Sequence, residues 1–148
     1  MPNLELRPVS QADHAAWLSL WQDYQRFYET EIAANISRVT WQRFLDPDEP
    51  MHAALAWHGA QAVGLVHFIY HRSCWATDNY CYLQDLFVDS GHRGAGAGRA
   101  LIEHVYAEAH ATGASRVHWL TQDHNAVAIQ LYDRIADRSG FVQYRRML

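Results

Sequence analysis

The chain has 148 residues, of which 49% are hydrophobic and 13% aromatic, so it has enough apolar side chains to build a core of its own. These proportions exclude a disordered polymer and predict one globular domain over residues 1–148. The formal net charge of −4 and a pI of about 6.2 exclude an overall basic field, so no nucleic-acid partner is expected.

The N-terminus and the cysteine count both favour a cytoplasmic protein. Residues 1–5 hold no basic region followed by an apolar run, and no stretch is long and apolar enough to span a bilayer, so no membrane partner is expected. Cys74 and Cys81 are too few for a disulfide framework, and we interpret both as reduced, structural residues. The ten histidines are scattered without the spacing of a metal site, so no metal is expected.

The first third of the chain predicts a short strand and two helices. Residues 4–7 alternate as a strand does, and Pro8 ends the alternation. Ser10, with Asp13 three residues later, is typical of a capping box, and an apolar stripe at helical spacing follows at Trp17, Leu20, Trp21, Tyr24, Phe27 and Tyr28. We expect this stripe to pack in the core, with the alternative that its last residues line a substrate pocket. A second, short helix is predicted at 40–45, where Thr40 can cap.

The remaining chain alternates strands with helices and shows no repeat, linker or low-complexity segment. Strands are predicted at residues 53–57, 62–70, 80–88, 117–120 and 141–146. Helices are predicted at 98–112, which Gly113 ends, and at 125–136. Gly64 lies inside a strand and predicts a bulge or a close contact. This mixed order predicts an α/β domain of three layers around a mixed sheet.

The most informative stretch is a glycine-rich arc between the strand at 80–88 and the next helix, and it reads Arg93, Gly94, Ala95, Gly96, Ala97, Gly98 and Arg99. Small residues let successive backbone N–H groups converge, and the N-terminal end of a helix favours an anion. A P-loop would need a lysine after a glycine, and a dinucleotide fingerprint would need a glycine at position 99. Neither is present, so the arc predicts a phosphate site of another kind.

The arc resembles the Arg/Gln-x-x-Gly-x-Gly/Ala loop of the GCN5-related N-acetyltransferases, a loop that grips the pyrophosphate of acetyl-CoA. The flanking segments resemble the same superfamily. Residues 82–88 are similar to the strand of its polyamine and histone acetyltransferases, and its last helix is matched at Asn125, Ala128, Leu131 and Tyr132. The resemblance implies acetyl-CoA as cosubstrate and a sheet that splays after the central strand, where the pantetheine arm enters.

The resemblance also implies which residues meet the cosubstrate. Backbone N–H groups of the central strand would stabilise the oxyanion, and Asn125 would bind the pantetheine arm, although a helix N-cap is its alternative role. The expected cofactor-binding residues are Leu86, Phe87, Val88, Arg93, Gly94, Ala95, Gly96, Ala97, Gly98, Arg99, Asn125 and Tyr132.

Acetyl transfer to an amine needs a neutral nitrogen and a proton for the departing sulfur. Tyr132 matches the family tyrosine and is the expected acid, with a tyrosine packed under the sheet as the alternative. Asp85 is the expected proton acceptor, and otherwise it would bind backbone amides or an arginine. The resembled polyamine enzymes carry an acidic residue at the position of Gln84, so the chain departs from them there. Strand alternation sends Gln84 and Asp85 to opposite faces unless a bulge intervenes.

These features predict acetyl-CoA-dependent N-acetylation of a primary amine by direct attack in a ternary complex. The acceptor would be a small amine, a polyamine, an amino acid or a lysine side chain, met by Tyr28, Glu29, Glu31, Gln84 and Asp85. The alternatives are a non-catalytic acyl-CoA-binding or regulatory module, and a nucleotide-binding protein without acyl chemistry. The resemblance further implies a homodimer, with residues 141–146 as the edge that pairs with a second subunit.

Overall fold

A computed structural model describes residues 3–148; Met1 and Pro2, the start of the N-terminus in which no targeting segment is expected, lie outside the described residues. A five-stranded sheet has the order β1-β2-β3-β4-β5, with strands Leu4–Pro8, Met51–His58, Gln61–His71, Tyr80–Val88 and Arg116–His118. The first four strands pair antiparallel, and β5 pairs parallel with β4. The helices are α1 His14–Phe27, α2 Ala34–Leu45, α3 Ala97–Ala111 and α4 Ala126–Ile135.

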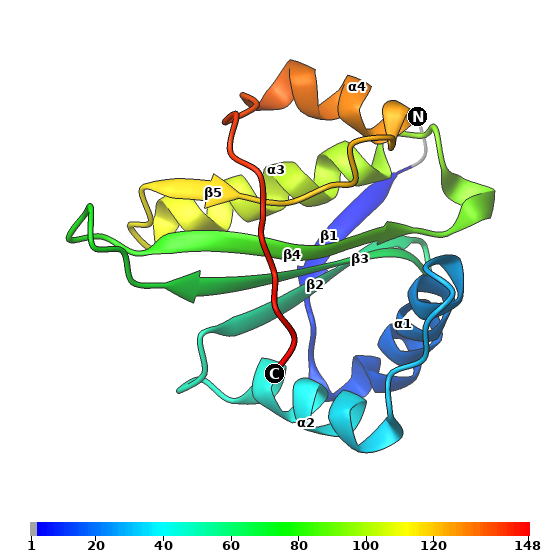
Figure 1. Ribbon diagram of the computed structural model, residues 1–148. Helices are drawn as coiled ribbons and strands as arrows, with labels where there is room; N and C mark the ends of the chain where they lie inside the picture. The colour runs from blue at the N-terminus through cyan, green and yellow to red at the C-terminus, as the bar shows by residue number, and fades with distance from the viewer. Residues whose placement is uncertain (1–2) are drawn as a thin grey trace.

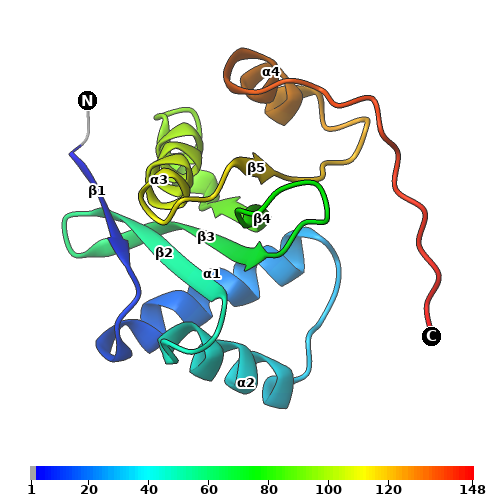
Figure 2. The same ribbon diagram turned by 90° about the vertical axis from the view of Figure 1, so that its left-hand side faces the viewer.

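The helices cover both faces of the sheet. Figures 1 and 2 show α1 and α2 on one face and α3 and α4 on the other. The sheet thus forms the middle of three layers, and the predicted α/β architecture is confirmed. Among residues 3–148 no helix is long and apolar enough to cross a membrane.

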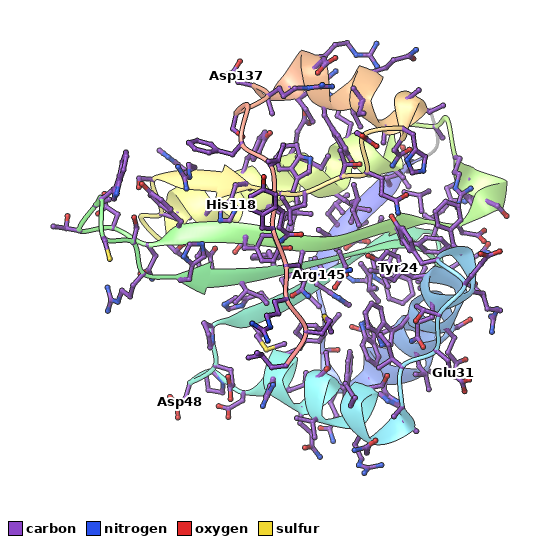
Figure 3. The ribbon with its side chains drawn as sticks, viewed as in Figure 1. Tyr24, Glu31, Asp48, His118, Asp137 and Arg145 are labelled. Atoms are coloured by element: carbon purple, nitrogen blue, oxygen red, sulfur yellow. The ribbon has the colours of Figure 1, made fainter. Side chains whose placement is uncertain are left out.

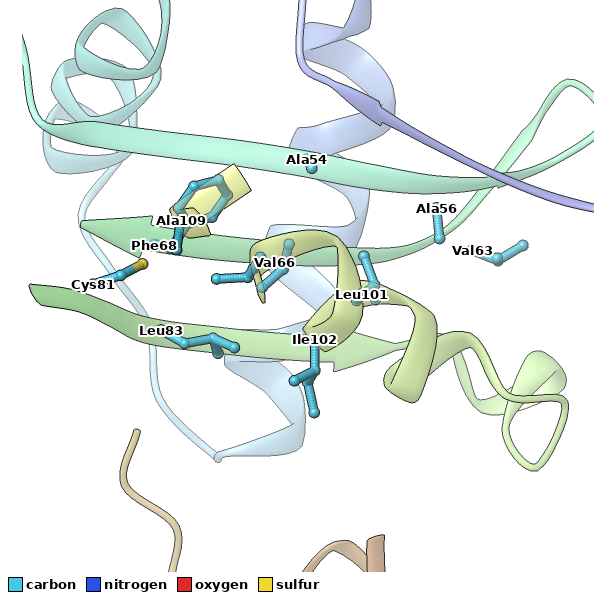
Figure 4. Packing of buried hydrophobic residues seen from close by; sticks show 11 residues of the cluster. Ala54, Ala56, Val63, Val66, Phe68, Cys81, Leu83, Leu101, Ile102 and Ala109 are labelled. Atoms are coloured by element: carbon cyan, nitrogen blue, oxygen red, sulfur yellow. The ribbon is translucent and has the colours of Figure 1, made fainter. Parts of the chain in front are cut away.

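One core lies between the sheet and α3. Helical spacing places Leu101, Ile102, Val105 and Ala109 on the face of α3 that meets β2, β3 and β4, as Figure 4 shows for three of these residues. Full burial of a side chain such as Leu101 contributes about 1.5–3 kcal/mol to the free energy of unfolding. Gly64 confirms the predicted close contact, because a Cβ there would lie 3.0 Å from the Phe87 carbonyl oxygen.

The second core lies between the sheet and the helices α1 and α2, and it is built largely from tryptophan. Trp17 and Trp21 of α1 pack with Trp41 of α2, with Trp17 and Trp41 ring centroids 5.0 Å apart. The indole nitrogen of Trp21 donates a hydrogen bond to Ser37 Oγ at 3.0 Å, which ties the two helices together. The first half of the predicted aromatic stripe is therefore core, as expected.

Two predicted elements differ from the structure. The helix predicted at 40–45 begins earlier, at Ala34. Its N-cap position is Ala33, which has no side chain able to cap, so the sequence carries no cap signal at the true start of the helix. The strand predicted at 141–146 is wrong: residues 137–148 form no ladder with the described chain. A strand needs a neighbour to pair with, and Figure 2 shows this segment running away from the rest of the molecule.

Candidate active site

The sheet opens between β4 and β5. Three pairs join the strands, the last of them Tyr82 with His118. Beyond this pair the described part of β4 is paired only with β3, so residues 83–88 border an open edge. In an antiparallel ladder alternate residues direct their N–H groups away from the partner strand. At least one N–H group among Leu86, Phe87 and Val88 therefore faces the opening, as an oxyanion site requires.

A bulge in β4 lies where the strands separate. Phe68 pairs with Leu83 and His67 pairs with Asp85, which leaves Gln84 as the extra residue. A bulge bends its strand and increases its twist, so it helps β4 to leave β5. Simple strand alternation therefore does not apply to Gln84 and Asp85, because a bulge lies at this point. Asp85 faces α1, and Gln84 is exposed at the bulge.

Four side chains form a continuous hydrogen-bonded chain on the α1 side of the sheet. The indole N–H of Trp17 donates to His67 Nε2 at 2.9 Å, and His67 Nδ1 lies 2.9 Å from Asp85 Oδ2. The Tyr24 hydroxyl donates to Asp85 Oδ1 at 2.8 Å. Both carboxylate oxygens thus have a partner, and the Asp85 side chain is only 14% exposed.

The direction of each bond in this chain follows from the indole. An indole N–H can only donate, so His67 Nε2 must accept. The ring proton therefore lies on Nδ1, and Nδ1–H donates to Asp85. Asp85 receives two hydrogen bonds as a carboxylate, and the phenolic oxygen of Tyr24 keeps its lone pairs for another donor.

Further tyrosines surround this carboxylate. Burial raises the pKa of Tyr24, with Asp85 next in effect, and the neighbouring Tyr28 and Tyr82 raise it further. Burial also raises the pKa of Tyr132, with Tyr28 as the second cause. Direct contacts support the same grouping, because Tyr24 is hydrogen-bonded to Asp85 and its ring lies 5.0 Å from that of Tyr28. Each phenol with a raised pKa is protonated at neutral pH and can donate a hydrogen bond.

The glycine arc has the backbone that an anion site needs. Gly94 and Gly96 have φ of 82° and 86°, in the left-handed region that favours glycine, and no atom lies within 4 Å of a Cβ built at either position. Gly96 is the N-cap of the 15-residue α3, and the N–H groups of that helix's first turn have no partner within the helix. A pyrophosphate group fits the arc on these grounds.

The side chain of Arg93, the first residue of the arc, is held in place by contacts with β4 and α1. Its Nε donates to the Val88 carbonyl at 3.0 Å, and its guanidinium lies 5.0 Å from the Phe27 ring centroid and 5.6 Å from that of Phe87. Arg99, by contrast, pairs with Glu103 at 2.9 Å on the surface of α3. Of the two arginines, Arg93 thus lies against β4 and the end of α1, whereas Arg99 is paired along its own helix.

The structure does not bring all of the remaining predicted residues to the Asp85 carboxylate. Asn125 occupies the N-cap position of α4, and its amide donates to Thr121 Oγ1 at 3.3 Å, without a side-chain cap bond. Tyr28 and Glu29 are exposed at the end of α1. Glu31 lines a groove of about 620 Å³ between α1 and α2, together with Arg26 and other residues of both helices. Figure 3 shows Glu31 well away from Tyr24.

Neither cysteine belongs to this region. Cys81 is buried against α3, and burial raises its pKa to about 12, whereas Cys74 is exposed in the β3–β4 loop. Within residues 3–148 no three histidine, cysteine, aspartate or glutamate side chains are grouped as metal ligands.

Two polar members of the site, His67 and Tyr24, had no predicted chemical role. Tyr24 was assigned to the core stripe, and His67 was one of ten scattered histidines. A signal was present, since His67 stands between Val66 and Phe68 inside an apolar strand, where a polar side chain requires a partner.

A glycine arc at a helix N-terminus, a splayed β4–β5 edge and a buried carboxylate among tyrosines are the features expected of an acyl-CoA-dependent transferase. Comparison with known proteins agrees. Residues 14–136 match the family model described as acetyltransferase (GNAT) family, and the chain belongs to this family.

Two curated relatives cover most of the chain. The D-amino-acid N-acetyltransferase HPA3 of Saccharomyces cerevisiae is 34% identical over 143 residues, 95% of this chain and 89% of the relative. The thialysine N-epsilon-acetyltransferase of Caenorhabditis elegans is 30% identical over 136 residues, 91% and 83% of the two chains. Among solved structures, AAC(6')-Iy in complex with a CoA bisubstrate analog has a TM-score of 0.86 at 14% identity, with 99% of each chain covered. The chain is thus an acetyl-CoA-dependent N-acetyltransferase, and the non-catalytic alternatives are set aside.

Proposed function

We propose that the protein transfers the acetyl group of acetyl-CoA to the primary amine of a small molecule, by direct attack in a ternary complex. The observation that carries this proposal is the Asp85 carboxylate, which lies on the strand that borders the splay and is bonded to Tyr24 and His67. A buried carboxylate among aromatic rings attracts a cation and can take a proton from it. No metal is required by this chemistry.

An amino-acid-like acceptor is favoured over a polyamine. Gln84 stands where the resembled polyamine enzymes are acidic, and the two curated relatives are named for D-amino acids and thialysine. Glu29 and Tyr28, at the end of α1, are proposed contacts for the same acceptor.

An acceptor screen that measures released CoA tests this proposal. It includes D- and L-amino acids, thialysine, a polyamine, an aminoglycoside and a lysine peptide. We expect turnover with an amino-acid-type amine above that with the polyamine. Turnover only with the polyamine or the peptide would contradict the proposed acceptor, and turnover with none of them would contradict the proposed function.

We assign Tyr132 as the acid that protonates the departing sulfur. Its phenol is half-buried against Trp119, with ring centroids 5.3 Å apart, and burial followed by Tyr28 raises its pKa, so it carries a proton at neutral pH. Tyr132→Phe should retain acetyl-CoA affinity and lose about 10–1000-fold in kcat. Normal turnover in this variant would show that another group supplies the proton.

The arc is the proposed pyrophosphate site, and Gly96→Asp tests it. The substitution places a negative charge in the open space beside the α3 N-terminus, so CoA affinity measured by calorimetry should fall more than about 10-fold. Gly113→Asp is a matched control because Gly113 has φ of 84°, no atom within 4 Å of its Cβ position, and lies at the other end of α3. Equal CoA affinities in the two folded variants would contradict the assignment.

We further propose a homodimer, with residues 137–148 of each subunit lying against the other. Phe141 is 91% exposed and Tyr144 is 95% exposed, and β5 is an edge strand, so an unpaired segment and a free edge occur together. Phe141→Ser with Tyr144→Ser should shift the mass measured by light scattering toward one chain. A wild-type protein with the mass of one chain at micromolar concentration would contradict the proposed dimer.

The exposed free thiol of Cys74 supports the proposed cytoplasmic location.

A further inference from the structure

We propose that Tyr24 is the group that contacts the acceptor ammonium and passes its proton to Asp85, while Trp17 and His67 hold Asp85 in place. This inference rests on the proposed function and assigns the route of the proton within it. The alternative route is direct transfer from the ammonium to Asp85, whose side chain is only 14% exposed and whose oxygens are each bonded to one of these neighbours.

The polarity of the hydrogen-bonded chain carries the argument. Trp17 can only donate, so it fixes the proton of His67 on Nδ1, and that proton is donated to Asp85 Oδ2. The other oxygen, Oδ1, then receives the Tyr24 hydroxyl proton. The phenolic oxygen of Tyr24 is left with lone pairs only, so it is an acceptor toward whatever approaches. An ammonium group, which has donors and no acceptor, is the complementary partner.

The position of Tyr24 allows this contact. Tyr24 is half-buried on the last turns of α1, and its ring lies 5.0 Å from that of Tyr28 and 5.9 Å from that of Phe87. Figure 1 shows the C-terminal end of α1 reaching the C-terminal end of β4, and Figure 3 labels Tyr24 there. The titratable groups that face it are His67 from β3, Asp85 and Tyr82 from β4, and Tyr28 from its own helix. Aromatic faces around the phenol suit the alkyl stem of a cation.

The proton transfer balances with the chemistry. The ammonium gives one proton to the Tyr24 oxygen as Tyr24 gives its own proton to Asp85 Oδ1, which leaves a neutral amine, an intact phenol and a carboxylic acid. The nitrogen lone pair then forms the bond to the acetyl carbon, and the carbon–sulfur bond breaks with its electron pair on sulfur. The second nitrogen proton replaces the one that Tyr132 gives to sulfur, and the third remains on the amide. Asp85 finally returns its proton to water.

A pH profile distinguishes a relay from a structural tyrosine. An alkylamine with a pKa near ~10 is only about 0.3% neutral at pH 7.5. An enzyme without the relay can use only this neutral fraction, so its rate is limited by the concentration of neutral amine. Tyr24→Phe should therefore lose about 100-fold or more in kcat/KM at pH 7.5 and less than about 10-fold at pH 9.5. Asp85→Asn should show the same convergence, that is, a deficit in kcat/KM that shrinks toward the wild-type value as the pH rises. The reason is that the asparagine N–H would donate to the Tyr24 oxygen and so reverse the direction of the hydrogen bond. The double variant should be no slower than either single one.

Tyr106→Phe is the matched control. Its hydroxyl donates to the Ile135 carbonyl at 2.9 Å, away from Asp85, so this variant loses a comparable hydrogen bond and any loss of rate should be independent of pH. A second measurement does not depend on turnover: calorimetry with the acceptor and CoA should show about 10-fold weaker acceptor binding to Tyr24→Phe, the loss of one charge-assisted hydrogen bond. Thermal unfolding verifies that each variant is folded.

The outcomes separate the relay from the proposed function. Active wild-type protein with a Tyr24→Phe deficit that is the same at pH 7.5 and 9.5, or with no deficit, would overturn the relay alone. Convergence in Asp85→Asn but not in Tyr24→Phe would assign direct transfer to Asp85 and would also overturn it. A wild-type protein that acetylates no amine would overturn the proposed function and the relay together.

Discussion

The hydrogen bond from Trp17 to His67 should carry a measurable share of the stability. Trp17 is fully buried, and Trp17→Phe keeps an aromatic ring while it leaves His67 Nε2 buried without a donor. An orphaned buried acceptor costs about 1–3 kcal/mol in the free energy of unfolding. The smaller ring adds about 1 kcal/mol from lost contacts. We expect a total loss of about 2–4 kcal/mol.

Trp57 provides the matched control in the same core. Its indole nitrogen is buried and has no hydrogen-bond partner among residues 3–148. Trp57→Phe removes the same part of the ring together with an unsatisfied donor, so relief of about 1–3 kcal/mol offsets the lost contacts. Urea unfolding followed by circular dichroism should place Trp17→Phe at least about 2 kcal/mol below Trp57→Phe. Equal losses in the two variants, with equal dependence on urea, would refute the reasoning about the hydrogen bond.

Three further predictions follow from the packing and the titratable groups. Gly64→Ala should lower the free energy of unfolding by about 1–3 kcal/mol, because its Cβ would lie 3.0 Å from Leu101 Cδ1 and the Phe87 carbonyl oxygen. Gly98→Ala is the control: its Cβ would have its nearest neighbour at 3.9 Å, so this variant should be neutral or stabilising in thermal unfolding. Glu29 has φ of 54° at the end of α1, so Glu29→Gly should stabilise by up to about 1 kcal/mol, and unchanged acceptor kinetics in this variant would remove Glu29 from the proposed acceptor site. Burial raises the pKa of Cys81 to about 12, so the unfolded chain loses this proton at a lower pH than the folded chain does. The free energy of unfolding should therefore fall by about 1.4 kcal/mol per pH unit as the pH rises from about 9 toward 12. Cys81→Ala should flatten that slope between pH 9 and 10, and a thiol reagent should find one reactive cysteine in the native protein.

The sequence predicts the order of elements well where local patterns and caps are strong. The strand at Tyr80–Val88 has the predicted bounds, and α3 begins one residue before its prediction. Ser10 confirms its capping role, with its backbone N–H donating to Asp13 Oδ2 at 2.8 Å. The start of α2 was missed because Ala33 provides no cap, and the strand at 141–146 was predicted from a pattern that needs a partner strand.

The sequence predicts only part of the site. One part is built from residues that are neighbours in the sequence, and the other from residues far apart in it. The arc depends on neighbouring residues, so the sequence identifies it, and Gly94 and Gly96 have the positive φ values that favour glycine. The chain from Trp17 to Asp85 joins residues 50 and 18 positions apart, and no local pattern pairs them. The sequence does not decide whether a bulge occurs at Gln84, because a polar pair inside a strand is compatible with either register.

The exposed thiol of Cys74 also makes the molecule convenient to handle. It lies in the loop before β4, while the glycine arc follows the other end of that strand. Nine residues of strand at about 3.3 Å each separate the two by about 30 Å. Since Cys81 is buried, a maleimide dye or a surface tether would attach at one place and in one orientation. Immobilised in this way, the molecule would present its arc to solution, ready for binding measurements on a chip.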